Sequence, residues 1–129
     1  MKTAEELYEI SKNKAPEIVA EILSGVKEKI ILRCEEEAHK GATYYTIRLE
    51  QGLSYVKNLL LEECLKIAKE FENNGYKVSI DDYGNGYYIN FRMTFSWNGK
   101  VCPLSSKLQC YCLYNTDKGI IKEHERITI

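Results

Sequence analysis

The stretch YYINFRMTFSW, residues 87–97, decides the fold because apolar and polar side chains alternate along its whole length. A period of two residues is typical of a β-strand that buries one face. The apolar positions are Tyr87, Ile89, Phe91, Met93, Phe95 and Trp97, and the intervening ones are Tyr88, Asn90, Arg92, Thr94 and Ser96. The pattern predicts a strand with Phe91, Met93 and Phe95 buried beneath helices.

The segment DDYGNG, residues 81–86, joins this strand to a second alternating run over residues 76–81. A glycine loop that binds a dinucleotide lies between a strand and a helix and carries a longer glycine pattern. Here the glycines lie between two predicted strands. Gly84-Asn85-Gly86 is therefore interpreted as the turn of a β-hairpin, and Asn98-Gly99 as the turn of another.

The N-terminal residues show the spacing of amphipathic helices. Thr3 and Glu6 form a capping box, which predicts a short first helix that residues 13–16 interrupt. A second helix is predicted from Pro16 to Gly41, since proline suits the first turn of a helix and glycine the position after its end. The apolar positions of this second helix are Val19, Ile22, Val26, Ile30 and Cys34.

The middle of the chain predicts a strand over residues 43–49, with Tyr45, Ile47 and Leu49 facing inward. A third helix is predicted over residues 53–73. Its buried stripe is Val56, Leu60, Cys64, Ile67 and Phe71. Its end at Asn73-Asn74-Gly75 uses residues that tolerate a left-handed backbone.

Two further alternating runs, residues 107–114 and 120–129, are predicted to be strands. Helices followed by hairpin-connected strands are typical of an α+β protein. The sequence therefore predicts a single α+β domain over residues 1–129, with N-terminal helices packed on one face of a mainly antiparallel sheet of about five strands.

Composition bounds the classes of function. The 129 residues include 18 basic and 19 acidic side chains, so the net charge is −1. This balance does not favour nucleic-acid binding that is driven mainly by electrostatic attraction. The charged N-terminus lacks a signal-peptide core, and no apolar run is long enough to span a membrane. We expect a cytoplasmic protein without membrane contact. Its five cysteines, an odd number, are then reduced thiols rather than a disulfide framework.

A zinc site built from Cys102, Cys110, Cys112 and His124 is weighed against core packing. Structural zinc ligands usually come as C-x2–4-C pairs on a turn. Cys110-Tyr111-Cys112 instead has its two thiols on one side of a predicted strand, where free cysteine behaves as a small buried hydrophobe. Core packing is favoured, and no metal and no cofactor are predicted.

Candidate catalytic groups are few. Asp81 and Asp82 are adjacent on a strand and point to opposite faces, and acidic residues are ordinary at the mouth of a hairpin. Cys34 and His39, five residues apart on one helix, do not share a face well. With no nucleophile motif, phosphate loop or zincin pattern, the sequence favours a protein that is not an enzyme, with no catalytic residues.

The predicted outer face of the sheet carries the candidate binding residues. Tyrosine and arginine often dominate the binding energy of interfaces; they also stack on bases and pair with phosphates. A plain solvated sheet face is the competing interpretation. The candidate binding residues are Tyr44, Arg48, Tyr88, Asn90, Arg92 and Arg126.

The stretches EELYEISKNKAPEI, at residues 5–18, and NNGYKVSI, at residues 73–80, together with the aromatic-rich strand that closes on Ser96-Trp97, carry a resemblance over residues 1–97. The chain resembles small uncharacterised α+β proteins encoded by phages and prophages of Gram-positive bacteria. The resemblance implies a phage accessory protein, such as an inhibitor of host defence or a minor structural or regulatory factor. It implies no catalytic or binding residues.

Two functions are therefore hypothesised. The first is a non-enzymatic protein that binds and inhibits a host defence protein in the host cytoplasm. The alternative is a binder of nucleic acid or of a small nucleotide through the tyrosine- and arginine-rich sheet face. A monomer and a homodimer are both left open, because residues 120–129 could form an edge strand whose charged side chains discourage pairing.

Overall fold

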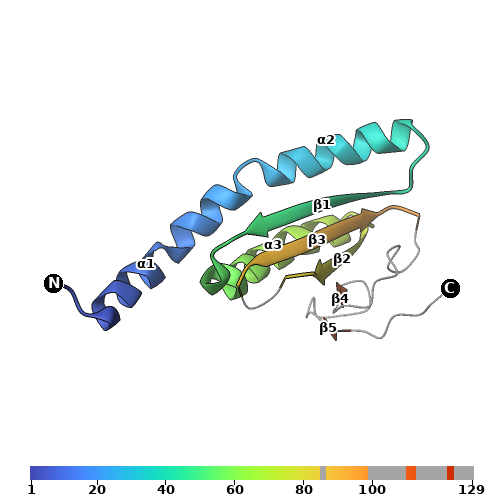
Figure 1. Cartoon of the computed structure of the whole chain (residues 1–129). Coiled ribbons are helices and arrows are strands. Elements are labelled where there is room, and N and C mark those ends of the chain that lie inside the picture. Colours follow the sequence, from blue (N-terminus) through green and yellow to red (C-terminus); the bar gives the residue numbers. More distant parts are fainter. Residues whose placement is uncertain (85–86, 99–109, 113–121, 124–129) are drawn as a thin grey trace.

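The computed structural model describes residues 1–84, 87–98, 110–112 and 122–123, the last two segments as backbone only. The helices are α1 (Ala4–Leu23), α2 (Val26–His39) and α3 (Lys57–Asn73), the last preceded by the short 3₁₀ helix η1 (Ser54–Val56). The long strands are β1 (Tyr44–Gln51), β2 (Lys77–Asp82) and β3 (Ile89–Ser96). The protein is an α+β structure, in which α2 packs against β1 and α3 against β2 (Figure 1).

The expected break between the first two helices is wrong. Residues 4–23 form one helix with Pro16 inside it, and α1 ends instead at Ser24-Gly25. Gly25 has a φ of 72°, a left-handed conformation that glycine adopts without steric cost. Proline removes one backbone hydrogen bond at a cost of about 3 kcal/mol. Packing of Val19, Ile22 and Leu23 against the core offsets this cost.

The other predicted helix ends are close to the observed ones. The Thr3 hydroxyl accepts from the Glu6 amide at 3.2 Å, as a capping residue should. The Glu6 carboxylate accepts in return from the Thr3 hydroxyl, at 3.3 Å, rather than from its amide. Gly41, with a φ of 89°, ends the second helix as predicted, and α3 ends at Asn73.

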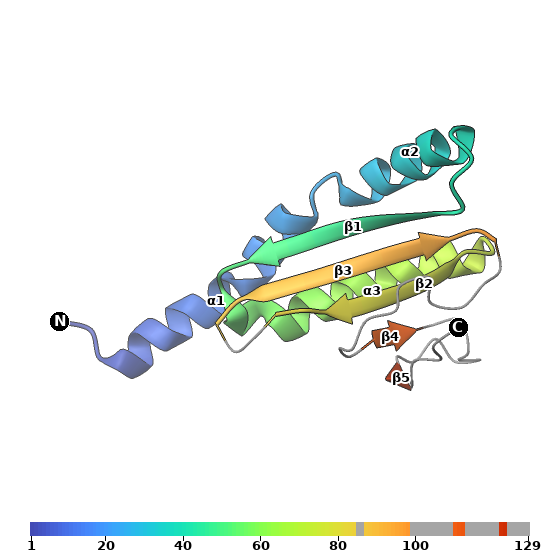
Figure 2. The same ribbon diagram turned by 45° about the vertical axis from the view of Figure 1, so that its right-hand side comes forward.

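The central strand of the three long ones is β3, which pairs antiparallel with β1 on one side and β2 on the other. Tyr45, Ile47 and Leu49 lie opposite Phe95, Met93 and Phe91, so the apolar positions of β1 and β3 share one face. The long pairing of β2 with β3 confirms a hairpin, although Asn85 and Gly86 lie outside the described residues. Viewed from a second side, β1, β3 and β2 form a twisted layer with α3 behind it (Figure 2).

The core lies between the apolar face of the sheet and the helices. The burial of its residues confirms the alternation predicted for the centre of the strand. Ile89, Phe91, Met93 and Phe95 are fully buried, with Ile30 of α2 and Leu60 of α3 against them. The alternation fails at its ends because the strand is shorter than predicted: Tyr87 is 85% exposed and Trp97 only half-buried. In α3, Leu60 and Cys64 are fully buried as predicted, but Ala68 is fully buried in place of Ile67, which packs at the margin of the core.

The predicted antiparallel sheet is confirmed for its three long strands, and its count of about five strands is not confirmed. Two short segments, β4 (Cys110–Cys112) and β5 (Lys122–Glu123), continue the sheet beyond β2. The residues that would lengthen them, within 107–114 and 120–129, lie mostly outside the described part of the chain. Among the described residues, no helix is long and apolar enough to cross a membrane.

Candidate functional site

The sheet face opposite the helices carries those candidate binding residues that the structure describes, and the register shows which of them meet. Arg48 of β1 lies directly opposite Arg92 of β3. One step along the same face, the hydroxyls of Thr46 and Thr94 are 3.0 Å apart and hydrogen-bonded. That threonine pair links the two strands beside the arginines, which start from opposite backbone positions on one face.

Arg92 is held by an aromatic ring. Its guanidinium carbon lies 4.1 Å from the centroid of the Tyr83 ring, a close cation–π contact. Within the described residues its Nε is buried and makes no hydrogen bond. Across the β2–β3 pair, Asp81 lies opposite Arg92 and brings a carboxylate into the same row. The Tyr83 ring thus orients the Arg92 guanidinium.

Arg48 is the more accessible of the two arginines. Its side chain is 51% exposed and lies 3.4 Å from a carboxylate oxygen of Glu50. Such an exposed ion pair contributes little stability, so Arg48 can exchange Glu50 for a partner's acceptor at little cost. We call the exposed Arg48 and the stacked Arg92 together the arginine patch.

The end of the β2–β3 hairpin at which Tyr83 follows β2, called the hairpin end below, is held by several polar contacts. Lys57 of α3 reaches the Asp82 carboxylate at 2.6 Å, where the Asp82 side chain is 8% exposed. The other Asp82 oxygen accepts from the Gly84 amide at 2.9 Å. The Tyr83 amide donates to the Asn90 carbonyl at 2.8 Å. These contacts place the Tyr83 ring beneath Arg92.

Gly84 is required by a close approach rather than by an unusual backbone angle. A Cβ at this position would lie 2.5 Å from the Tyr88 carbonyl oxygen and 3.0 Å from the Asn90 amide nitrogen. Both atoms belong to the backbone, which cannot turn aside as a flexible side chain can. The first glycine of the G-N-G motif therefore supports the arginine patch and shows no feature of a phosphate loop.

The remaining candidate residues are spread along the sheet. Tyr44 lies opposite Ser96, at the far end of β3 from Tyr88 and Asn90. Both tyrosines are exposed, Tyr44 by 44% and Tyr88 by 42%. Arg126 lies outside the described residues. The structure thus brings together Arg48 and Arg92, places Asn90 and Tyr88 near one end of the patch, and leaves Tyr44 apart.

The competing interpretation, a plain solvated sheet face, does not fit the centre of the outer face. The polar side chains of Ser79, Asp81, Thr94 and Ser96 are 2%, 1%, 0% and 1% exposed. On this face Arg48 and Tyr88 are exposed, and Asn90 and Arg92 are partly exposed.

Two elements of this site were not predicted from sequence. Tyr83 was interpreted only as part of the turn, although an aromatic residue next to a strand end can reach back over that strand. Lys57 lies at the start of α3, and only the tertiary structure brings it to Asp82. No spacing in the sequence connects those two residues.

Chemistry at the described cysteines is suppressed by burial. Cys34 and Cys64 are free thiols. Burial, reinforced by Glu35, raises the pKa of Cys34 to about 11, and burial, with Glu63, raises the pKa of Cys64 to about 12. Both are protonated near neutral pH, so neither is an activated nucleophile. His39 is exposed while Cys34 is buried, so the two form no dyad.

Metal ligands do not gather in the described part of the chain, where no group of three His, Cys, Asp or Glu side chains could hold an ion. The zinc hypothesis for Cys102, Cys110, Cys112 and His124 falls on side chains outside the described residues.

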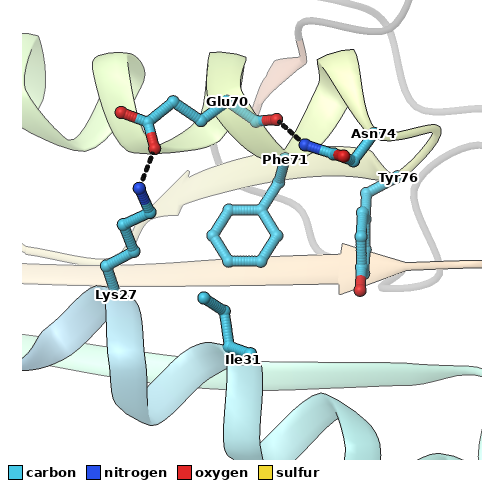
Figure 3. Close-up of a pocket in the computed structure, with 6 residues that line it drawn as sticks. All are labelled: Lys27, Ile31, Glu70, Phe71, Asn74 and Tyr76. Carbon is cyan, nitrogen blue, oxygen red and sulfur yellow. Dashed lines mark hydrogen bonds and ion pairs between the residues drawn. The ribbon is translucent and has the colours of Figure 1, made fainter.

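A cavity of about 430 Å³ opens between α2 and α3, away from the arginine patch. Figure 3 shows an ion pair between Lys27 and Glu70 at one end and the Phe71 and Tyr76 rings at the other. The Asn74 side-chain amide donates to the Glu70 carbonyl at 2.9 Å. The residues that line this cavity come mainly from α2 and α3, which are distant in sequence, so no local spacing pattern predicts them.

No protein-family model, no curated protein and no solved structure matches the chain.

Proposed function

We propose that this chain is a non-enzymatic binding protein that uses the arginine patch to bind and inhibit a host protein. The observation that carries the proposal is the geometry of Arg92, which is stacked on Tyr83 and lies opposite the exposed Arg48. Arginine and tyrosine are enriched among residues that dominate interface energies. Preorganised side chains lose less conformational entropy on binding.

The charges around the patch favour a protein partner over a polyanion. Glu50 lies beside Arg48, and Asp81 lies opposite Arg92, so each arginine has a carboxylate near it. The whole chain has a net charge of −1. Nucleic-acid binding draws much of its affinity from unopposed positive charge. A mixed patch with tyrosines at its margin is instead typical of protein interfaces.

The inhibitory role is proposed from the resemblance to phage proteins. The chain resembles small phage and prophage proteins over residues 1–97, and such accessory proteins often block host defence by occupying a host protein. On this proposal the protein acts in the host cytoplasm and needs no cofactor and no catalytic residue. Its partner presents acceptors for Arg48 and Arg92, such as a pair of carboxylates.

The test is capture of a partner from host lysate, followed by mass spectrometry, with matched variants as bait. The Tyr88→Ala, Arg92→Ala double variant and the Arg48→Ala variant should lose a protein that the unaltered chain captures. Lys66→Ala is the control, because it removes one positive charge from an exposed position on α3. Retention of the partner by both patch variants, at unchanged melting temperature, would remove the proposal.

The alternative function, binding of nucleic acid or a nucleotide, is favoured by one specific observation: two arginines occupy opposite positions on neighbouring strands, with the exposed Tyr88 near one end of the same face. It is tested with labelled single-stranded DNA and a nucleotide panel at two salt concentrations. Steeply salt-dependent binding that Arg48→Ala weakens would favour this alternative over the protein partner.

A further inference from the structure

The N-terminal half of α1 lies away from the rest of the described protein. Every residue from 1 to 14 is exposed, and contact with the core begins at Ala15. Figure 1 shows this part of α1 projecting past the sheet with no described element beside it. Two of its large apolar side chains, Leu7 and Ile10, are 53% and 46% exposed.

A projecting helix of this length gains little stability by itself. Isolated helices shorter than about 12–15 residues are marginal in water, and most helical stability in proteins comes from packing an apolar face. The ion pairs within the segment, Glu9 with Lys12 and Lys14 with Glu17, are exposed and therefore weak. Leu7 and Ile10 lie three residues apart and share a face that the described chain leaves uncovered.

The charges on that face indicate what covers it. Glu6, Ile10 and Lys14 are spaced by four residues, so they form one row along the helix with Leu7 beside it. The row is acidic at its N-terminal end, apolar in the middle and basic at its C-terminal end. An identical helix laid antiparallel, with Ile10 against Ile10, brings each Glu6 level with the other copy's Lys14.

We propose that this row is a self-association surface, on which two copies of the chain pair antiparallel about a two-fold axis at Ile10. Such an interface is self-complementary: the same patch serves both copies, with Leu7 packed beside the central isoleucines and a Glu6–Lys14 ion pair at each end. A parallel arrangement would place Glu6 against Glu6 and Lys14 against Lys14, and these repulsions select the antiparallel one. Tyr8 lies on another side of the helix, where Lys12 is 5.9 Å from its ring centroid.

The pairing is expected to be weak. A contact between two short helical segments lies at the small end of the range of specific interfaces, below about 1,200 Å² in total. The dimer should therefore dissociate on dilution, and it should dissociate further in salt, because the terminal ion pairs are exposed to solvent.

The experiment is sedimentation analysis over a dilution series, with substitutions at the row and a control beside it. Ile10→Lys should raise the dimer dissociation constant at least about tenfold, because it places two positive charges at the axis. Tyr8→Lys adds the same charge on another side of the helix and should leave association unchanged. Equal loss in both variants, or a monomer at every concentration of the unaltered chain, would overturn the proposal.

Exchanging the charges separates a lost interface from a damaged helix. Glu6→Lys and Lys14→Glu should each weaken association, since each places like charges at both ends of the pair. A mixture of the two variants should associate as the unaltered chain does, because all four charges are then complementary. A mixture that stays monomeric would show that the row does not pair antiparallel, and would overturn the proposal without bearing on the arginine patch.

Discussion

Arg48 and Arg92 lie directly opposite each other across the β1–β3 pair, two like charges on neighbouring strands. Like charges in this position destabilise an antiparallel pair unless something compensates them. Here Arg92 lies against the Tyr83 ring at 4.1 Å, and Arg48 pairs with Glu50. The compensation is only partial, since Arg92 Nε makes no hydrogen bond within the described residues. A juxtaposition that costs stability is consistent with the binding role proposed for this face.

The contribution of Phe91 to stability tests the fold. Phe91 is fully buried on β3, and its truncation to alanine should lower the free energy of unfolding by about 3–5 kcal/mol through lost burial and a cavity. Tyr87→Ala is the control on the same chain segment, because Tyr87 is 85% exposed. Urea unfolding of both variants measures the difference. Similar small losses in both would contradict the assigned core.

Gly84→Ala tests the close approach at the hairpin end. The added Cβ meets the Tyr88 carbonyl oxygen at 2.5 Å, so the hairpin end must shift, at an expected cost of about 1–3 kcal/mol. Gly52→Ala is the matched control, since a Cβ there meets nothing within 4 Å. Thermal unfolding compares the two, and a Gly84→Ala protein as stable as Gly52→Ala would contradict this geometry.

The Lys57–Asp82 contact should be worth more than an ordinary surface ion pair. Asp82 is 8% exposed, so Lys57→Ala leaves a nearly buried carboxylate without its cation, at an expected cost of about 1–3 kcal/mol. Lys66→Ala breaks the exposed Lys66–Glu63 pair and should change stability by less than about 1 kcal/mol. Chemical denaturation of both variants provides the measurement, and equal effects would show that burial of Asp82 does not strengthen the pair.

Elements in which apolar residues recur at a regular spacing could be predicted from the sequence. The alternation across 87–97 gave the central strand and its buried face, because a period of two leaves one face apolar whatever the neighbours are. The sequence misplaces the break between the helices because proline is typical of a helix start, whereas the chain breaks at Gly25, which adopts the left-handed conformation, and Pro16 lies inside α1.

The candidate site could be predicted only in part. Arg48 and Arg92 were assigned to one face from their alternation, and the register does bring them opposite each other. The Tyr83 ring beneath Arg92 and the Lys57 contact behind it depend on how α3 and the hairpin meet, and local spacing carries no such information. The burial of Thr94 and Ser79 could not be predicted either, since alternation alone cannot show that a polar face is covered.

The buried thiol of Cys64 gives a dependence of stability on pH. Burial raises its pKa to about 12 in the folded protein, from an ordinary value of 9.0. Above pH 9 the unfolded chain therefore releases the thiol proton while the folded chain keeps it. Stability from this group is fully present below pH 9 and is lost as the pH rises toward 12. The folded chain should resist thiol-specific reagents at Cys64 over the same range.

The measurement compares the unaltered chain with Cys64→Ala by urea unfolding at several alkaline pH values under reducing conditions. Other groups also titrate there, but they are common to both proteins and cancel in the difference. The stability advantage of the unaltered chain over Cys64→Ala should be constant below pH 9 and shrink above it. An advantage that stays constant up to pH 11 would mean that the Cys64 thiol ionises equally in the folded and unfolded states, and that it is not enclosed between α3 and the sheet.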